Sequence, residues 1–178
     1  MSSGCVRQVE YLNNGLRRIN AFMLPGDLFG LDEGHSFMAE AVTTTRLRCY
    51  PRSAVEALAR SNIALSMRLR VLTIKNLHHA YRHKILLSRK TAAEKVASFV
   101  IEMDQRIGKS SREAFSLPMG MGDIADYLGL TRETLSRVLS EMIQRGSIRL
   151  GEGLELHDRT SLHEQAGYRT DPWASGHE

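Results

Sequence analysis

This 178-residue chain lacks several sequence features, and each absence excludes a class of protein. The two cysteines, Cys5 and Cys49, form no CxxC pair, so the sequence predicts neither a disulfide framework nor a cysteine-only metal site. No apolar run reaches the length of a membrane span, and the N-terminus lacks the charged-then-apolar plan of a signal peptide. We therefore expect a cytoplasmic protein with no membrane partner.

Characteristic catalytic spacings are also missing. The sequence shows no paired carboxylates, nucleophile–base pair or phosphate-binding loop at a telling spacing, which argues against an enzyme. What the chain does have is a hydrophobic fraction of 42%, sufficient for a sizeable core in one or two domains. Its net charge of +4 indicates only a mild preference for polyanions.

The most informative pattern lies in residues 121–143. Gly129 supplies the left-handed residue that ends one helix, Thr131 caps the next, and small Ala125 lets the two helices cross closely. The segment predicts a helix-turn-helix, whose second helix, residues 131–143, enters the DNA major groove. Apolar residues recur at helical spacing on both sides of the turn: Ile124, Ala125 and Leu128, then Leu135, Val138, Leu139 and Met142.

The start of that second helix carries side chains suited to DNA. Arg132, Glu133, Ser136 and Arg137 offer donors and acceptors to base edges and phosphates. The alternative is an ordinary helical hairpin whose charged residues face only water. The spacing of the alanine, glycine, leucine and valine residues favours DNA binding over that alternative.

The N-terminal part has the pattern of short strands. Residues 6–12 alternate apolar and polar, Asn13-Asn14-Gly15 predicts a hairpin turn, and residues 18–24 return as a strand. Residues 37–50 predict one or two further strands. These strands are too few to close a barrel, so we expect a chain that begins partway through a β domain, with exposed sheet edges that promote association. Ile19, Ala21 and Met23 are expected on one side of the second strand, and Val42, Leu47 and Cys49 are the candidates for burial.

Helical patterns run from residue 52 to about residue 107. Residues 53–59 predict a short helix, and Ser61-Asn62 cap a long one that reaches about Leu87 and suits dimerisation. Two seams compete along the long helix, and the periodicity does not choose between them. One comprises Leu65, Leu69, Leu72, Asn76, His79 and His83, and the other comprises Thr73, Leu77, Ala80, Lys84 and Leu87.

The C-terminal half continues with a capped helix and a hairpin. Thr91 and Glu94 have capping-box spacing at the start of a helix whose buried face is Val96, Phe99, Val100 and Met103. A β-hairpin is expected on either side of Gly151-Glu152-Gly153, as the wing of a winged helix. The remaining expectations are a polar loop over 108–112, a short strand over 113–117, a last helix over 160–166 and a disordered tail over 167–178.

This order of elements resembles the C-terminal three quarters of a Crp/Fnr family transcription regulator, over about residues 3–166. Leu24-Pro25-Gly26-Asp27-Leu28-Phe29-Gly30 is similar to the family's Gly-Asp/Glu turn, and Thr131-Arg132-Glu133-Thr134-Leu135-Ser136-Arg137 is similar to its recognition helix, particularly in the Fnr and FixK-like subgroup. The resemblance implies an α+β fold. Its parts are a partial β-roll sensor domain of the cyclic-nucleotide-binding type (1–60), a dimerisation helix (61–88) and a winged helix-turn-helix domain (89–166).

The resemblance also implies roles for single residues. The subgroup's Glu, Ser, Arg trio is matched by Glu133, Ser136 and Arg137, and its target is a palindrome of TTGAT-type half-sites. Arg132 is grouped with these base contacts, with contact to a phosphate alone as its alternative. Thr131 and Thr134 are expected to contact phosphates. The family further implies a homodimeric activator that contacts RNA polymerase. For the contact between the two subunits we select the seam Thr73, Leu77, Ala80, Lys84 and Leu87.

Departures from the family concern the signal that is sensed. Residues 32–40 are acidic and lack the arginine that meets a cyclic phosphate, so cyclic-nucleotide binding is not expected. The N-terminal cysteine group of the iron–sulfur members is absent, so no cofactor is predicted and Cys49 is expected to be a small buried residue. His79 and His83 share a helix face, but no nearby carboxylate in that helix completes a ligand set, which favours solvated or dimer-seam histidines over a metal site.

A second hypothesis belongs to a different class of function. The short β domain suggests a ligand- or partner-binding member of the family that retains a vestigial helix-turn-helix. Such a protein would act by forming unproductive heterodimers with full-length relatives through the long helix.

Overall fold

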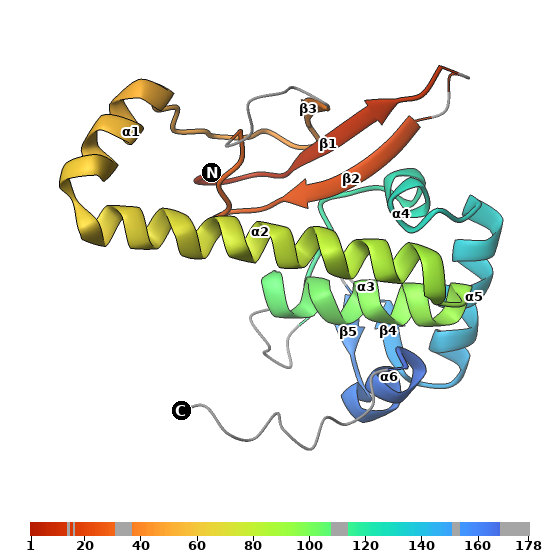
Figure 1. Ribbon diagram of the computed structural model, residues 1–178. Helices are drawn as coiled ribbons and strands as arrows, with labels where there is room; N and C mark the ends of the chain where they lie inside the picture. Colours follow the sequence, from red (N-terminus) through yellow and green to blue (C-terminus); the bar gives the residue numbers. More distant parts are fainter. Residues whose placement is uncertain (14, 16, 31–36, 108–113, 151–153, 168–178) are drawn as a thin grey trace. The chain divides into compact units, whose positions relative to one another are not determined.

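The computed structural model describes residues 1–13, 15, 17–30, 37–107, 114–150 and 154–167. It contains two compact units, Met1–Lys84 and Ile85–Glu178. Strands occur in both units, and the helices include one of 27 residues (Figure 1). Among the described helices, none is long and apolar enough to cross a membrane.

The first unit is built on a three-stranded antiparallel sheet. Strands β1 (Val6–Tyr11), β2 (Arg17–Met23) and β3 (Met38–Ala41) lie in the order β2-β1-β3 (Figure 1). The strands expected at 6–12 and 18–24 are therefore confirmed. The buried apolar side chains of β1, β2 and the residues next to them form a small core of Cys5, Val6, Val9, Ile19, Phe22 and Leu24.

The buried face of β2 differs from the expected alternation. Ile19 is buried and so is Phe22, whereas Ala21 and Met23 are only half-buried. The cause is a register shift between Gln8 and Val9, where one extra residue of β2 is accommodated. A β-bulge of this kind turns the following side chains to the opposite face, so a strict period of two fails there.

Beyond β3 the expectation of burial was wrong for two residues. Leu47 is 45% exposed, and Cys49 is also exposed, while Val42 is half-buried. Strand pairing ends at Ala41, and Ser3 and Arg46 then form an isolated bridge. Outside the paired sheet, alternation along the sequence no longer determines which side chains are covered.

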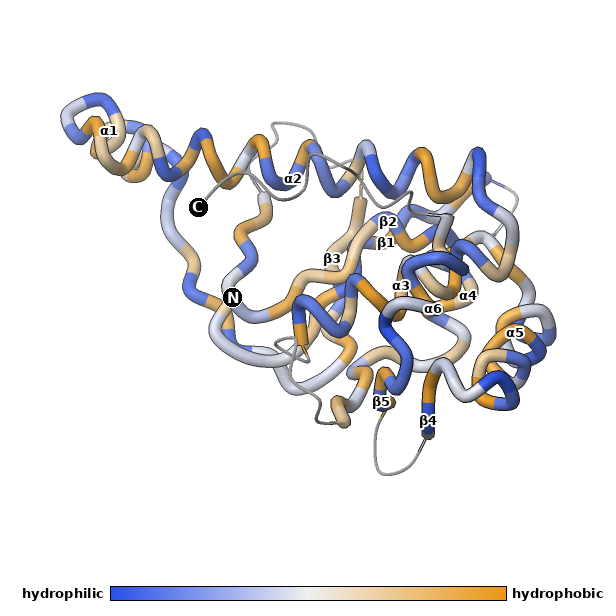
Figure 2. Tube along the Cα trace, turned by 90° about the horizontal axis from the view of Figure 1, so that it is seen from below, coloured by the Kyte–Doolittle hydropathy of each residue, from blue (hydrophilic) through white to orange (hydrophobic). Residues whose placement is uncertain are grey.

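Helices α1 (Arg52–Ser61) and α2 (Ile63–Arg89) follow. The expected cap is present, because the side chain of Asn62 accepts a hydrogen bond from the backbone of Leu65 at 2.9 Å. Hydrophobic and hydrophilic residues alternate around α2 (Figure 2). One of its two predicted seams is half-buried throughout: Leu65, Leu69, Leu72, Asn76, His79 and His83.

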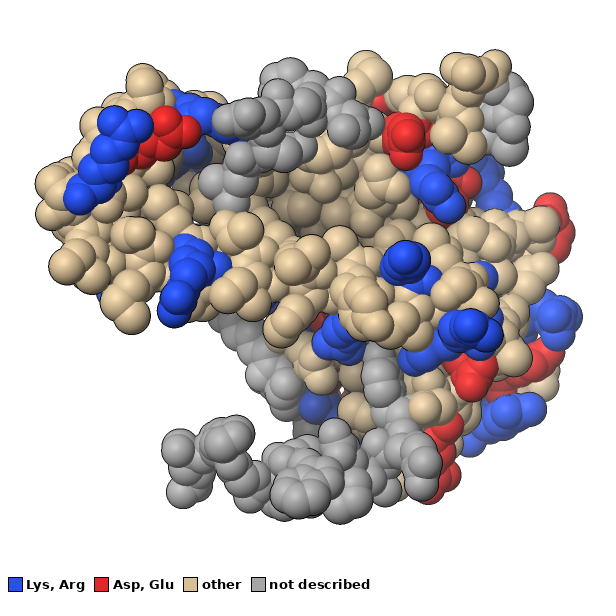
Figure 3. Space-filling view, in the orientation of Figure 1, with Lys and Arg blue, Asp and Glu red and all other residues tan. Residues whose placement is uncertain are grey.

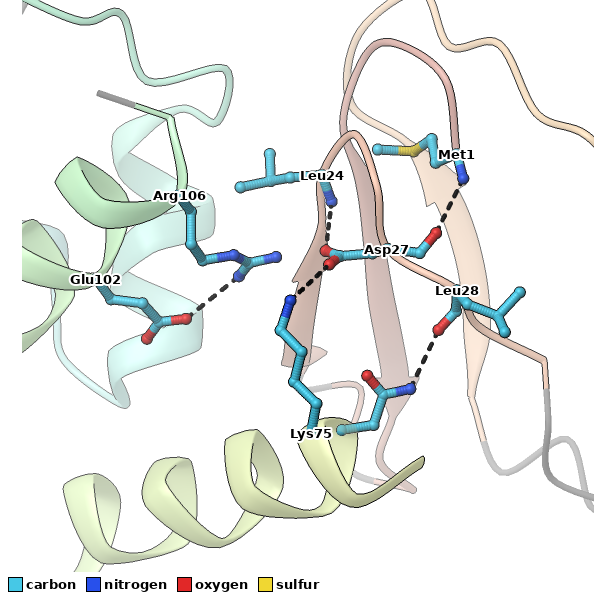
Figure 4. A network of polar contacts seen from close by, with 8 residues as sticks. Met1, Leu24, Asp27, Leu28, Lys75, Glu102 and Arg106 are labelled. Carbon is cyan, nitrogen blue, oxygen red and sulfur yellow. Dashed lines mark hydrogen bonds and ion pairs between the residues drawn. The ribbon is translucent and has the colours of Figure 1, made fainter. Parts of the chain in front are cut away.

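Asp27 joins α2 to the turn after β2 (Figure 4). Its carboxylate accepts a hydrogen bond from the backbone of Leu24 at 2.9 Å and lies 4.0 Å from the amino group of Lys75. The next residue of α2, Asn76, donates to the carbonyl of Leu28 at 3.1 Å. At Asn76 the half-buried seam of α2 therefore contacts the segment that follows β2.

The second unit encloses the larger core. Helix α3 (Ala92–Arg106) begins with the predicted capping box, in which Thr91 and Glu94 exchange side-chain and backbone hydrogen bonds. Its expected buried face is confirmed, since Val96, Phe99, Val100 and Met103 are at most 1% exposed. The hairpin is also confirmed, as strands β4 (Ile148–Leu150) and β5 (Leu154–Leu156), followed by helix α6 (Arg159–Gln165).

Two further expectations have different outcomes. The segment around Phe115 forms only an isolated bridge with Leu154, with backbone hydrogen bonds of 2.9 and 2.8 Å, instead of a strand. The expected loop at 108–112 and all but the first residue of the expected tail at 167–178 lie outside the described residues.

Candidate nucleic-acid interface

Two helices and a tight turn form the candidate interface. Helix α4 (Met121–Leu128) ends at Gly129, whose φ of 60° and ψ of 45° are left-handed, and α5 (Arg132–Gln144) begins three residues later. The backbone N–H of Leu130 donates to the carbonyl of Ala125 at 3.0 Å, as in a Schellman motif. Glycine suits position 129 because other residues pay a steric cost there.

Packing beneath the turn fixes how the two helices are oriented. Ala125 of α4 is 2% exposed, which matches the prediction that a small residue lets the helices approach closely. The inner face of α5 is buried through Leu135, Val138 and Met142. Tyr127 packs its ring against Phe99 of α3, with centroids 5.8 Å apart and an angle of 56° between the planes. The predicted helix-turn-helix is therefore present and anchored in the core.

Thr131 organises the first turn of α5. Its hydroxyl oxygen accepts a hydrogen bond from the backbone of Thr134 at 3.1 Å and lies 3.1 Å from that residue's hydroxyl. The pKa of Glu133 is lowered by a hydrogen bond from its own backbone N–H and by one from the Thr131 hydroxyl. Glu133 is therefore an ionised acceptor at neutral pH.

The four predicted base contacts lie on one exposed side of α5. Arg132, Glu133, Ser136 and Arg137 are all exposed, opposite the buried inner face of the helix. Of the two predicted phosphate contacts, Thr131 is exposed and Thr134 is half-buried. The structure thus groups all six residues at the N-terminal end of one helix.

Two partners of these residues were missed by the sequence analysis. Glu141 accepts a hydrogen bond from Arg137 at 2.8 Å, and the opposite charges at i and i+4 were the available signal. Gly122 lies against the guanidinium of Arg132. The sequence signal for this contact was a glycine inside an apolar helical pattern, because such a glycine in many proteins allows another group to pack closely.

Charge around this site is mixed. On the face shown in Figure 3, basic and acidic side chains are interspersed over the second unit. The wing contributes Arg149, which is exposed on β4. The arrangement can form hydrogen bonds that distinguish bases, in addition to general attraction to phosphates.

Comparison with known proteins agrees with this geometry. Residues 94–165 match the model of the Crp-like helix-turn-helix domain. The chain is 41% identical to the nitrogen fixation regulation protein FixK of Azorhizobium caulinodans, over 90% of this chain and 67% of that protein. The chain belongs to the Crp/Fnr family of transcription regulators. It spans about two thirds of the length of such relatives, including FixK of Rhizobium meliloti, at 37% identity over 84% of this chain and 68% of that one.

Solved structures of Crp/Fnr regulators show the same fold. The structure of FixK2 from Bradyrhizobium japonicum superposes with a TM-score of 0.85 at 41% identity, covering 92% of this chain and 83% of that one. The predicted α+β fold and the family assignment are confirmed, and this is a family of DNA-binding transcription regulators rather than enzymes. The acidic stretch at 32–40, on which the expectation about cyclic nucleotides depends, lies largely outside the described residues.

Proposed function

We propose that this Crp/Fnr regulator binds a palindrome of TTGAT-type half-sites through the exposed start of α5. The observation that carries the proposal is the position of Glu133, Ser136 and Arg137 on one exposed side of a core-anchored helix. Arg137 would donate to guanine O6 and N7, and Glu133 would accept from cytosine N4. Ser136 is short enough to lie against thymine. The lowered pKa of Glu133 supports its role as an acceptor.

Thr131, Thr134 and Arg132 complete the proposed contacts with DNA. The two threonine hydroxyls lie 3.1 Å apart at the N-cap, where they can turn toward a phosphate while the Thr131 oxygen still accepts from the backbone of Thr134. Phosphate contacts set the register of the recognition helix, and base contacts then read the sequence. Arg132 is proposed to contact either a base or a phosphate.

The proposed active form is a homodimer that pairs through α2. At about 40 Å, this helix is long enough to serve as a dimer element. In the selected seam, Thr73, Leu77, Ala80 and Lys84 are exposed, whereas Leu87 is half-buried. Leu77 also belongs to a stripe of exposed large apolar side chains, comprising Ile63, Met67, Val71, Ile74, Leu77, Tyr81 and Ile85. We therefore propose a dimer contact centred on Leu77.

Such a dimer would place two recognition helices about one helical turn of DNA apart, which matches a palindrome. We further propose that it activates transcription by contacting RNA polymerase. Support comes from relatives, such as the transcriptional activatory protein AadR of Rhodopseudomonas palustris, 33% identical over 78% of this chain and 60% of that one. In the proposed domain organisation, residues 1–60 form the sensor domain, residues 61–88 form the dimerisation helix and residues 89–166 form the DNA-binding domain.

Fluorescence anisotropy with a duplex carrying TTGAT and ATCAA half-sites, compared with a scrambled duplex over a salt series, tests this function. We expect tighter binding to the palindrome at every salt concentration. Glu133→Ala and Arg137→Ala should each lower the preference for the palindrome, by about 1–3 kcal/mol per lost base contact. Equal, steeply salt-dependent binding to both duplexes would contradict sequence-specific recognition.

The second hypothesis, a heterodimerising partner, gives a different result in the same assay. A chain of that kind would bind neither duplex by itself. When mixed with a full-length relative, it would weaken that relative's binding to DNA. The exposed apolar stripe of α2 is the surface that such a heterodimer would use, and it is the observation that keeps this alternative in the test.

A further inference from the structure

Arg132 and Gly122 are in close contact although they belong to different helices. A Cβ atom added to Gly122 would lie 2.9 Å from both Cζ and Nε of Arg132, and nearer still to Nη2. The guanidinium of Arg132 therefore occupies the space that a side chain at position 122 would fill. The Arg132 side chain runs from the first turn of α5 onto the first turn of α4.

The backbone gives no other reason for a glycine at position 122. Gly122 lies inside α4 and is not among the glycines with positive φ, unlike Gly129 at the end of that helix. In a helix, glycine costs about 1 kcal/mol relative to alanine. Close approach of another group is a physical reason for glycine, and here that group is the Arg132 guanidinium.

The position of this contact bears on what Arg132 recognises. In a helix-turn-helix the second helix reads base edges, while the first helix crosses the DNA backbone. A guanidinium held on the first turn of α4 is displaced toward the helix that follows the phosphates. Arginine suits that task, because its planar fork forms paired hydrogen bonds with phosphate oxygens.

We propose that Gly122 is a positioning residue that holds Arg132 on α4, where Arg132 contacts a DNA phosphate instead of a base edge. The proposal rests on the proposed function and refines it, because base reading is then left to Glu133, Ser136 and Arg137. A substitution at Gly122 would change DNA affinity without touching a base-reading residue.

Four variants test the proposal: Gly122→Ala, Arg132→Ala, their double mutant, and Gly120→Ala as the matched control. Gly120 precedes α4, has a φ of −79° and has no atom within 4 Å of an added Cβ, so its substitution leaves Arg132 in place. Binding to the palindrome and to the scrambled duplex is measured by anisotropy over a salt series. Thermal unfolding of each variant shows that it is folded.

We expect Arg132→Ala to weaken binding to both duplexes by the same factor and to reduce the salt slope by about one per subunit. Gly122→Ala should shift affinity in the same direction, and it should add nothing when Arg132 is already alanine. Its melting temperature should not fall, because alanine favours helix and the displaced group is the end of a flexible side chain.

Two results would overturn the proposal. A loss of discrimination at one base pair in Arg132→Ala would make Arg132 a base contact. A Gly122→Ala effect that is absent, or is equal with and without Arg132, would show that Gly122 does not position Arg132. The coupling between positions 122 and 132 is also measured on the scrambled duplex. If the parent shows no preference for the palindrome, the proposed function is contradicted, but the coupling is still decided.

Discussion

Arg137, a proposed reader of guanine, is engaged one turn along α5 by Glu141, with 2.8 Å between Arg137 Nη1 and Glu141 Oε1. The Arg137 side chain is 65% exposed and that of Glu141 is 41% exposed, so water screens the pair and it is worth at most about 1 kcal/mol. Glu141→Gln should therefore change affinity for the palindrome by no more than about fivefold per half-site. Arg137→Ala should cost about 1–3 kcal/mol in discrimination.

Titrations of matched duplexes that differ at one guanine measure both effects. Arg137→Ala should bind the substituted duplex as well as the original one, because its base contact is gone. A Glu141→Gln effect as large as that of Arg137→Ala would instead mean that the ion pair, rather than the guanidinium alone, is required for recognition.

The proposed dimer contact on α2 predicts the oligomeric state of three variants. Leu77 is 66% exposed, so a charge there should be tolerated by the isolated fold and should convert the dimer to a monomer. Its neighbours at i−3 and i+3, Ile74 and Ala80, flank it on the same side of the helix. Ile74→Glu and Ala80→Glu should therefore weaken the dimer to a smaller extent than Leu77→Glu does.

Size-exclusion chromatography with light scattering, repeated over a range of protein concentrations, measures these shifts. Arg68→Glu is the matched control, since Arg68 is exposed on α2 but lies nine residues from Leu77, about half a turn out of phase. A dimer that survives Leu77→Glu and dissociates with Arg68→Glu would rule out the proposed contact.

The fold of the DNA-binding unit was readable from the sequence because its signals are local. Gly129 fixes the turn through its left-handed backbone, Thr131 caps α5 through its side chain, and the Thr91 capping box fixes the start of α3. The N-terminal unit was read less well, because its burial depends on pairing between distant residues. The bulge at Gln8/Val9 and the end of pairing at Ala41 each redirect side chains in ways that no local pattern reports.

Within the candidate site, the residue types and their exposure followed from helical periodicity, whereas their partners did not. The contact between Arg132 and Gly122 depends on how two helices cross, which is a property of the packed core. The half-buried seam of α2 was likewise decided by contacts such as that of Asn76 with the Leu28 carbonyl.

A partly buried ion pair links α3 to α6 in the DNA-binding unit. Asp104 has a side chain that is 5% exposed, and its carboxylate lies 3.0 Å from Arg159. Arg159→Met should destabilise this unit by about 1–3 kcal/mol, because it removes a donor from a buried acceptor. Exposed Arg145 provides the control, and Arg145→Met should change the unfolding free energy by less than about 0.5 kcal/mol. Equal losses in the two variants, measured by urea unfolding, would show that the pair contributes nothing specific.

The capping box of α3 predicts a pH dependence of stability. Hydrogen bonds from the backbone N–H and then the hydroxyl of Thr91 to the Glu94 carboxylate, each 2.7 Å, lower the pKa of Glu94. Because the folded-state pKa lies below the unfolded one, the charged cap stabilises the fold above the usual glutamate pKa of about 4.3. That stabilisation is lost as the pH falls through the folded-state value.

Denaturant unfolding of the parent and Glu94→Gln between pH 3 and pH 7 checks this expectation. The difference in unfolding free energy should be constant near neutral pH and should shrink in acid. Thr91→Ala should cost about 1 kcal/mol at pH 7, whereas Thr91→Ser keeps the hydroxyl and should cost less. A difference between parent and Glu94→Gln that stays the same down to pH 3 would mean that the Glu94 charge does not contribute to the cap.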